Sequence, residues 1–220
     1  LCDRSKLKAI IILQDPYPSF TKDSIMIADG IPMSCVNTDR LQPTLEQWYT
    51  GIENDFGNIG ESEKGFLVDM AMEADISYLL KEEGVLLLNS SLTCEKDKPG
   101  VHADMWLPFM KYFIEEIINK YYKGLPIVLC GSQAQRLEKF IDPMVHYIKK
   151  VEHPVAATYA NRQWDNGKCF RWANSLLLAN NGPEYKIRWY RTVEERRIRV
   201  EKKEKYQEQV VQPKTDLPWD

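Results

Sequence analysis

Four short, continuous runs of apolar residues constrain the fold of this chain more than any other feature of its sequence. Each run has the length of a strand, and each leads directly into polar or turn-forming residues. Continuous rather than alternating hydrophobicity is typical of strands covered on both faces, as in a parallel sheet. The four runs are Ala9–Leu13, Val85–Leu88, Ile127–Cys130 and the less regular Val145–Val151.

Stretches of helical character separate these runs. From Trp106 onwards the apolar residues recur at steps of three and four, which predicts one amphipathic face packed on the core. The alternation of strand and helix predicts right-handed crossovers and a three-layer α/β/α sandwich around a central four-stranded parallel sheet. The expected helices are Thr44–Ile52, Phe66–Glu83, Trp106–Lys123 and Ser132–Phe140, and Asn54–Lys64 is expected to be a loop.

The composition is that of a folded chain, with 44% hydrophobic and 28% charged residues among 220. It argues against wholesale disorder, and no apolar run approaches the ~20 residues that a membrane span needs. A formal net charge of −3 excludes a uniformly basic nucleic-acid coat but is compatible with a local basic groove. The five cysteines form no Cys-x-x-Cys pair, so the sequence predicts no metal site and a reduced, intracellular compartment.

The character of the sequence changes after Leu178. The stretch Ala179–Pro183 is a strong stop signal, and Glu194–Gln209 is a run of mixed charge. As a helix this run would be mostly solvated, whereas as a tail it could contact a partner; its composition favours the solvated helix face. The sequence therefore predicts one domain over residues 1–183 and a charged carboxyl-terminal extension, residues 184–220, that could bind a protein partner.

The polar residues that follow the four apolar runs are the candidate functional groups. In a sheet of this kind the loops beyond the carboxyl ends of the strands lie at one edge, where functional groups gather. Taken singly, each residue has an ordinary structural reading. Asp15 could cap a turn or helix, and Asn89 could be a satisfied turn residue. Ser132 could be a helix N-cap and His153 a structural histidine, but the joint placement of all four at one edge favours a functional site.

These motifs, in this order, resemble the uracil-DNA glycosylase family over about Ala9 to Leu178. Supporting similarities are Pro43-Thr44-Leu45-Glu46, which looks like the family's backbone-clamping loop, and Leu92-Thr93 after Asn89. Four motifs in order make a chance similarity improbable. They are Leu13-Gln14-Asp15-Pro16-Tyr17 for the water-activating loop, Gly84-Val85-Leu86-Leu87-Leu88-Asn89 for the uracil-reading strand, Gly131-Ser132-Gln133-Ala134-Gln135 for a phosphate-holding turn and His153-Pro154 for the DNA-intercalation loop.

The resemblance implies a catalytic pair. Asp15 would position a water molecule and offset the positive charge that builds up on the sugar as the N-glycosidic bond breaks. His153 would donate a hydrogen bond to the uracil oxygen that gains negative charge. No metal or organic cofactor is implied.

The resemblance also implies residues that bind the base and the DNA. Asn89 would pair with the uracil edge, and Tyr17 would pack against ring carbon five and exclude a thymine methyl group. The backbone amide of Gln14 would contribute to the same pocket, with Met33 as its lid. The residues implied to hold DNA phosphates are Thr44, Ser132 and Thr158, and Arg162 is a further candidate for contact with DNA.

The chain departs from the family pattern at several positions. Pro18 stands where most members have histidine, a change also found in poxvirus-like members, and Met33 stands where a stacking phenylalanine is expected. After His153-Pro154 the family's Ser-Pro-Leu-Ser is replaced by Val155-Ala156-Ala157-Thr158.

Alanine at position 157 is too short to fill the space that a flipped base leaves in the duplex. Either Tyr159, Arg162 or Trp164 supplies the wedge instead, or flipping from a duplex is weak and single-stranded DNA is preferred.

The leading interpretation is a monofunctional uracil-DNA glycosylase that acts on uracil-containing DNA, releases uracil, leaves an abasic site and favours single strands. The main alternative is a catalytically weak or inactive DNA-binding or scaffold protein on the same fold; a glycosylase with another base preference is a lesser one. The presence of both Asp15 and His153 favours catalysis, because a scaffold has no evident need for that pair.

Overall fold

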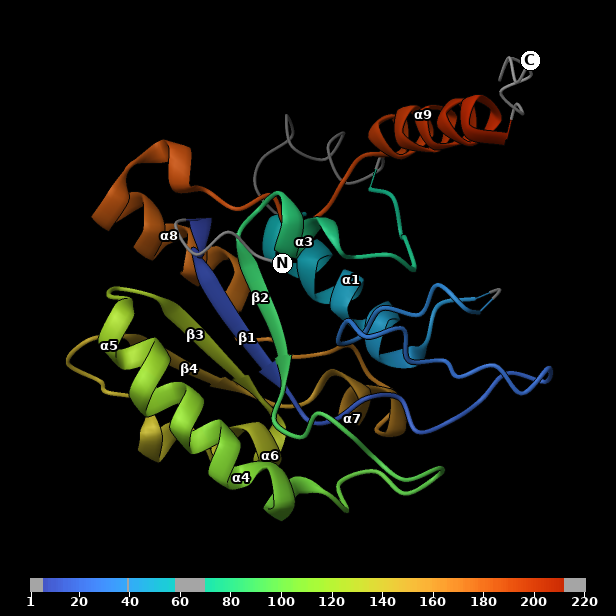
Figure 1. Cartoon of the computed structure of the whole chain (residues 1–220). Coiled ribbons are helices and arrows are strands. Elements are labelled where there is room, and N and C mark those ends of the chain that lie inside the picture. The colour runs from blue at the N-terminus through green and yellow to red at the C-terminus, as the bar shows by residue number, and fades with distance from the viewer. Residues whose placement is uncertain (1–5, 39, 58–69, 212–220) are drawn as a thin grey trace, which may run out of the picture.

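The computed structural model describes residues 6–38, 40–57 and 70–211 of the chain. All four predicted strands are present, and they form one parallel sheet in the order β2-β1-β3-β4 (Figure 1). The expected fold class, a three-layer α/β/α sandwich, is confirmed. The strands are β1 (Ala9–Leu13), β2 (Val85–Asn89), β3 (Pro126–Cys130) and β4 (Tyr147–Val151).

The strand register brings the carboxyl ends of all four strands level with one another. Leu13 at the end of β1 pairs with Asn89 at the end of β2, and Cys130 pairs with Val151 in β3 and β4. The polar motifs that follow the strands therefore emerge at the same edge of the sheet. In β1, which lies between two neighbours, no residue is more than 2% exposed, which explains its uninterrupted run of apolar residues.

Alternate side chains of the strands point into two separate cores. On one face, Ile11 packs with side chains of α1, α3 and α8. On the other face, Ile10 packs with side chains of α4, the π-helical turn η2 and α6. The helices are α1 (Pro43–Phe56), α3 (Tyr78–Lys81), α4 (Ala103–Tyr112), η2 (Phe113–Ile118), α5 (Asn119–Tyr121), α6 (Gly131–Gln135), α7 (Pro154–Tyr159), α8 (Cys169–Asn181) and α9 (Val193–Val211), with 3₁₀ turns η3 (Glu138–Phe140) and η4 (Pro183–Tyr185).

The predicted helix Phe66–Glu83 is wrong over most of its described length. Residues 66–69 lie outside the described residues, and between Met70 and Glu83 only the single turn of α3 is helical. The backbone of this segment forms hydrogen bonds with distant residues instead of with itself: the amide of Ala71 donates to the carbonyl of Arg191, and Tyr49 Oη bonds both backbone groups of Glu73. These tertiary contacts override the local helical pattern.

The other predicted helices need smaller corrections. Helix α1 runs to Phe56, through the start of the segment expected to be a loop; residues 58–64 of that segment lie outside the described residues. The predicted helix Trp106–Lys123 corresponds to α4, η2 and α5, whose buried stripe is Met110, Ile114 and Ile118. The predicted helix Ser132–Phe140 is broken into α6 and η3.

The chain does not leave the domain at the predicted boundary after residue 183. Helix α8 ends at Asn181, and Gly182, with a φ of +106°, turns the chain back, but Ile187 and Trp189 are each only 1% exposed. The ring of Trp189 lies 4.9 Å from that of Phe170 and 6.3 Å from that of Trp48, measured between centroids. The packed core therefore extends at least to Trp189, and the boundary at 183 lies inside it.

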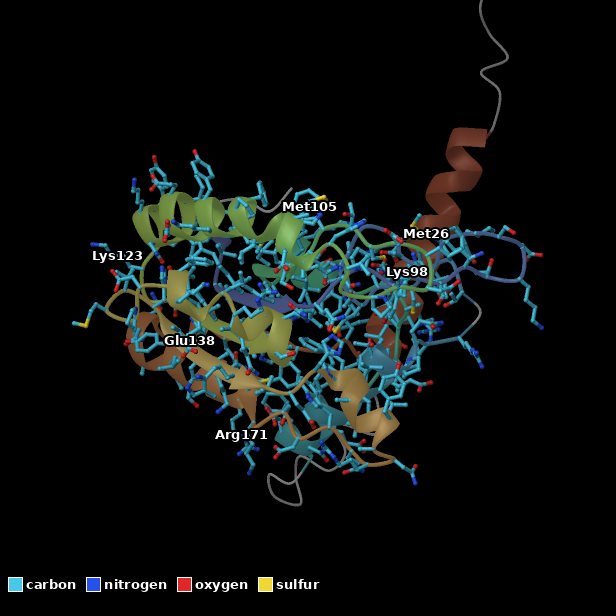
Figure 2. The ribbon with its side chains drawn as sticks, turned by 90° about the horizontal axis from the view of Figure 1, so that it is seen from below. Met26, Lys98, Met105, Lys123, Glu138 and Arg171 are labelled. Atoms are coloured by element: carbon cyan, nitrogen blue, oxygen red, sulfur yellow. The ribbon has the colours of Figure 1, made fainter. Side chains whose placement is uncertain are left out.

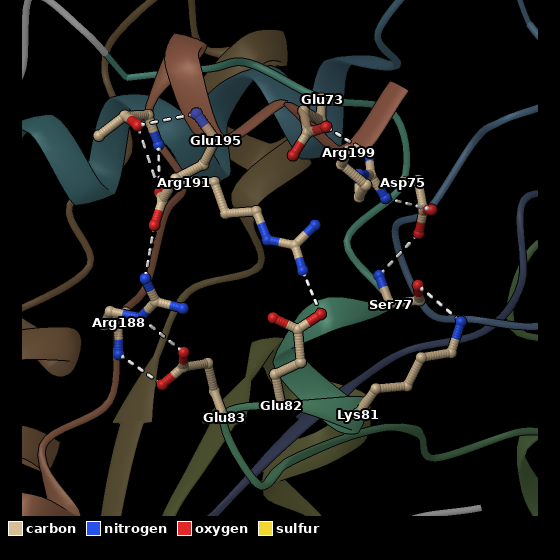
Figure 3. Close-up of polar contacts among 11 residues, drawn as sticks. Glu73, Asp75, Ser77, Lys81, Glu82, Glu83, Arg188, Arg191, Glu195 and Arg199 are labelled. Atoms are coloured by element: carbon tan, nitrogen blue, oxygen red, sulfur yellow. Dashed lines mark hydrogen bonds and ion pairs between the residues drawn. The ribbon is translucent and has the colours of Figure 1, made fainter. Parts of the chain in front are cut away.

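A network of ion pairs then attaches the start of α9 to the domain (Figure 3). It joins arginines of the carboxyl-terminal segment to acidic residues that flank α3 and to Glu195 of α9 itself. The first two turns of α9 are mainly solvated, as the sequence predicted for this charged run, but they are held at this network. The pairs are Arg188 with Glu83 and Glu195, Arg191 with Glu82, and Arg199 with Glu73 and Asp75.

Asp55 of α1 caps the amino terminus of α8 from across the core. It is 0% exposed, its Oδ2 accepts hydrogen bonds of 3.0 Å from the amides of Phe170 and Arg171, and its Oδ1 accepts one of 3.0 Å from Asn166 Nδ2. We expect Asp55→Ala to lower the free energy of unfolding by about 3 kcal/mol, because the cap is lost and buried donors are left unpaired. Urea denaturation measures this change; the same substitution at exposed Asp23 is the control, and a loss below about 1 kcal/mol would contradict the assignment.

Among the described residues, no helix combines the length and the apolar character that crossing a bilayer requires.

Candidate active site

A cavity of about 350 Å³ opens at the carboxyl edge of the sheet. Figure 2 views the molecule from this side, with Met26 and Lys98 labelled on the loops that follow β1 and β2. Seven of the ten residues that the sequence assigned to a site line this one cavity, although they are spread over about 140 positions of the chain. They are Gln14, Asp15, Tyr17, Met33, Thr44, Asn89 and His153.

Asp15 is fixed at the cavity by a backbone amide from the loop after β2. The amide of Gly100 donates a hydrogen bond of 2.5 Å to Asp15 Oδ2. Burial raises the pKa of Asp15 above its usual value, while the Gly100 amide, the Gln14 side chain and His102 act in the opposite direction. The carboxylate is thus partly desolvated yet held in one orientation, as a group that stabilises positive charge requires.

The whole loop from Gln14 to Pro18 is tied to the loop that follows Asn89. The carbonyl of Gln14 accepts hydrogen bonds from the amide of Ser91 and the hydroxyl of Ser90, at 2.9 and 2.8 Å. The carbonyl of Pro18 accepts a third from the amide of Asp97, at 3.1 Å. The two strand-end loops form one rigid unit, which adds to the stiffness that the prolines provide.

Gly100 is a functional position that the sequence reasoning missed. Pro99-Gly100 is recognisable as a turn signal, and Gly100 adopts a φ of +81°, which favours glycine. Nothing in the spacing shows that its amide reaches a side chain 85 positions earlier, because the contact depends on how two loops pack.

His153 is held as a neutral imidazole with a defined tautomer. It precedes α7, and its Nδ1 accepts a hydrogen bond of 3.3 Å from the amide of Val155. Burial lowers the pKa of His153 to about 4. Because Nδ1 is the acceptor, the proton of the neutral ring lies on Nε2, which is free to donate to a ligand.

Gly131, the first residue after β3, gives His153 the space that it needs. Its φ is +85°, and a Cβ added there would lie 2.8 Å from the Cβ of His153. Only glycine fits this close approach without displacing the imidazole. The Gly131-Ser132 motif thus has a role in the geometry of the cavity, apart from the phosphate contact that the resemblance implied.

The pKa of His153 leads to a pH-dependence prediction. Since the folded pKa is about 4 and the unfolded value is near 6.5, the unfolded chain takes up its proton first as the pH falls. Between pH 6.5 and 4 the protein should therefore lose up to about 3 kcal/mol of unfolding free energy relative to His153→Gln. Side-chain NMR should place the titration midpoint near pH 4 with the neutral-state proton on Nε2; a midpoint above pH 6 would contradict the assignment.

Asn89 presents a free amide to the cavity. It ends β2, is only 7% exposed, and makes no side-chain hydrogen bond to any residue that the structure describes. A buried amide without protein partners carries a cost unless a ligand or water satisfies it. Its donor and acceptor are therefore available to read the edge of a base.

Tyr17 and Met33 form a joined wall of the cavity. The Tyr17 hydroxyl donates a hydrogen bond of 3.0 Å to the carbonyl of Met33, and burial strongly raises the pKa of the phenol. Met33 is 5% exposed and has a φ of +66°, an uncommon conformation for a residue with a side chain. The carboxylate of Asp29 stabilises this turn by accepting hydrogen bonds from Ser34 Oγ and the amides of Ile31 and Val36.

The remaining predicted residues lie outside the cavity lining. Ser132 and Thr158 are exposed on α6 and α7, and Arg162 is exposed and forms a two-pronged ion pair with Glu152, at 2.6 and 2.5 Å. Their assignment to DNA stays a prediction. Within the described residues, no group of three or more histidine, cysteine, aspartate or glutamate side chains is placed to hold a metal ion.

Comparisons with known protein sequences find uracil-DNA glycosylases, the family that the sequence motifs resemble. No protein-family model matches the chain. It is 37% identical over 175 residues to the uracil-DNA glycosylase of Pseudomonas aeruginosa, covering 79% of this chain and 68% of that one. It is 30% identical over 179 residues to the uracil-DNA glycosylase of Amoebophilus asiaticus, covering 81% and 73%. A crystal structure of a mimivirus UNG variant in complex with UGI has the same fold, with a TM-score of 0.66, 24% identity and 84% and 70% coverage.

Proposed function

The chain belongs to the uracil-DNA glycosylase family, and we propose that it hydrolyses the N-glycosidic bond of deoxyuridine in DNA, the first step of base excision repair. It is then a monofunctional hydrolase that releases uracil and leaves an abasic site. The observation that carries the proposal is that Asp15, Asn89 and His153 line one cavity large enough for a single pyrimidine. A scaffold protein on this fold gains nothing from this convergence.

Asp15 acts on the sugar side of the bond. As the bond lengthens, positive charge develops on the deoxyribose and negative charge on the departing base. The oriented carboxylate of Asp15 offsets the positive charge and positions the attacking water, with the Gly100 amide preventing its rotation. A preorganised charge of this kind needs no reorganisation at the moment of reaction.

His153 acts on the base side. Its neutral ring carries a proton on Nε2, and this N–H donates a hydrogen bond to the uracil oxygen that gains negative charge. A neutral donor suits this role, because the hydrogen bond strengthens as charge develops and binds the ground state less tightly. In this mechanism the proton stays on the histidine, in keeping with the low pKa of about 4 that burial gives the ring.

Asn89 and Tyr17 select the base. The free amide of Asn89 offers one donor and one acceptor to the uracil edge, and cytosine presents the opposite pattern. Tyr17 is fixed by its hydrogen bond to Met33, so its ring cannot move aside for the methyl group of thymine. Met33 covers the base without the ordered stacking of an aromatic ring.

Release of uracil from an end-labelled oligonucleotide with a single deoxyuridine tests the proposal. The substrate should be offered as a single strand and as a duplex, with matched oligonucleotides that carry deoxycytidine or thymidine at the same position. We expect alkali-sensitive sites to form in the deoxyuridine oligonucleotides and not in those with deoxycytidine or thymidine. Binding of DNA without release would instead support the scaffold reading, and release of another base would support a different base preference.

Other parts of the sequence interpretation remain proposals. Thr44, Ser132 and Thr158 hold phosphates, and the reaction uses water without a metal or organic cofactor. An intracellular location follows from the DNA substrate. The ion pairs of Arg199 with Glu73 and Asp75 hold the first turns of α9 against the domain. A protein partner for the extension is therefore proposed only for the part of α9 that follows Arg199.

A further inference from the structure

We infer that Tyr159 is the wedge: the side chain that enters the base stack as the uracil nucleotide leaves it. The inference rests on the proposed function, since it concerns how a duplex substrate reaches the cavity. A nucleotide that swings out of a duplex leaves a gap, and unstacking costs a few kcal/mol. A side chain that fills the gap lowers this cost, so an enzyme of this class needs one close to its cavity.

The position where the family carries its inserted leucine cannot serve in this chain. Ala157 is 0% exposed and packs in the core beside the sheet. It lies on the face of α7 that turns towards α1, not towards solvent. A longer side chain at position 157 would therefore enter the core and not the solvent, so the shortness of alanine is only part of the reason that this position cannot supply the wedge.

Two of the three alternative residues are also engaged elsewhere. Trp164 is 1% exposed, its ring stacks on Trp48 at 6.2 Å between centroids, and its Nε1 donates to the carbonyl of Glu152. Arg162 is exposed, but both of its terminal nitrogens bind the carboxylate of Glu152. Entry of either into a base stack would break these contacts.

Tyr159 has none of these constraints. It is 85% exposed, and its side chain makes no hydrogen bond to any residue that the structure describes. Among the exposed large apolar side chains of the described residues, it is also the one that lines the cavity, together with His153 and Val155. A large aromatic ring thus stands in solvent at the entrance through which the flipped base passes.

The backbone that carries the Tyr159 side chain is firmly held. Tyr159 is the last residue of α7, whose Pro154 and Ala157 are buried. Hydrogen bonds from the amides of Ala160 and Arg162 to α7 carbonyls close the helix end behind it. A planar ring on a fixed support can stack on the neighbouring bases, an interaction worth about 1–3 kcal/mol.

The test compares uracil release from duplex and single-stranded substrates under single-turnover conditions. We expect Tyr159→Ala to lower the ratio of the duplex rate to the single-strand rate by about 10- to 100-fold, the loss of one stacking interaction. Tyr159→Phe should keep the ratio within about threefold of wild type, because stacking needs the ring and not the hydroxyl. Tyr112→Ala, which removes an exposed tyrosine on α4, is the matched control and should leave the ratio unchanged.

Chemical rescue separates a wedge from a merely structural role. A large planar aromatic nucleotide placed opposite the uracil fills the gap from the other strand, so it should restore the duplex rate of Tyr159→Ala and have little effect on wild type. A ratio that is the same for Tyr159→Ala and wild type, or a loss without such rescue, would overturn the inference.

A binding measurement keeps this inference distinct from the proposed function. A 2-aminopurine next to the uracil brightens when the stack opens, and this signal requires no bond cleavage. If wild type releases no uracil but the signal still depends on Tyr159, the proposed function fails and the wedge stands. If uracil is released and the signal is the same in Tyr159→Ala, the wedge fails and the function stands.

Discussion

Replacing Asp15 by asparagine is expected to slow uracil release on the order of a thousandfold. The amide keeps the size of the side chain but removes the negative charge that stabilises the sugar cation. Its NH₂ group would also compete for the position that the carboxylate oxygen holds beside the Gly100 amide. Single-turnover release from a single-stranded deoxyuridine substrate measures the effect, because base flipping then contributes least.

The same substitution at Asp23 is the control for Asp15→Asn. Asp23 is exposed in the segment between β1 and Met33 and does not line the cavity. Thermal unfolding of both variants should match wild type within a few degrees, which separates loss of chemistry from loss of fold. Release by Asp15→Asn within tenfold of the wild-type rate would show that the carboxylate does not stabilise the transition state.

Replacing Asn89 by aspartate is expected to lower uracil release at least about a hundredfold and to shift the base preference towards cytosine. An ionised carboxylate has acceptors only, so it would face the acceptor oxygen of uracil without a donor. The carboxylate could instead accept a hydrogen bond from the amino group of cytosine. Because Asn89 is 7% exposed and makes no side-chain bond to the described residues, the change removes no protein contact that could obscure the result.

Parallel assays with deoxyuridine and deoxycytidine at one position measure the preference of Asn89→Asp. Asn180→Asp, the same change at an exposed position near the end of α8, is the control and should retain the wild-type ratio of the two rates. An unchanged ratio in Asn89→Asp would mean that the base edge is read by other groups. The cavity would then need a different orientation of the base from the one proposed.

The two variants test different halves of the site. Asp15 is positioned by a contact between the loops after β1 and β2, whereas Asn89 is positioned by the strand register that pairs it with Leu13. The two roles are separable if Asp15→Asn slows uracil release without changing the base preference and Asn89→Asp changes the base preference. Equal behaviour of both variants would indicate that one residue acts through the other.

Contacts made across the tertiary structure explain the features that the sequence did not predict. The segment from Met70 to Asp75 has a helical pattern, but its backbone pairs with the segment around Arg191. The burial of Trp189 depends on the rings of Phe170 and Trp48, which no local pattern indicates. Each of these contacts joins residues that are far apart in sequence.

The sequence by itself determined the sheet, the edge that carries the site and three residues of the cavity, Asp15, Asn89 and His153. It could do so because continuous apolar runs select buried parallel strands, and parallel strands deliver their following residues to one edge. The other four predicted residues that line the cavity, Gln14, Tyr17, Met33 and Thr44, were implied by the resemblance to the uracil-DNA glycosylase family. Only the tertiary structure decided that Gly100 holds Asp15, that Gly131 makes room for His153, and that Tyr159 is exposed beside the cavity whereas Ala157 is buried. The physical reason is that periodicity reports which residues are buried, whereas loop contacts and the exposure of a single side chain depend on the packing of distant segments.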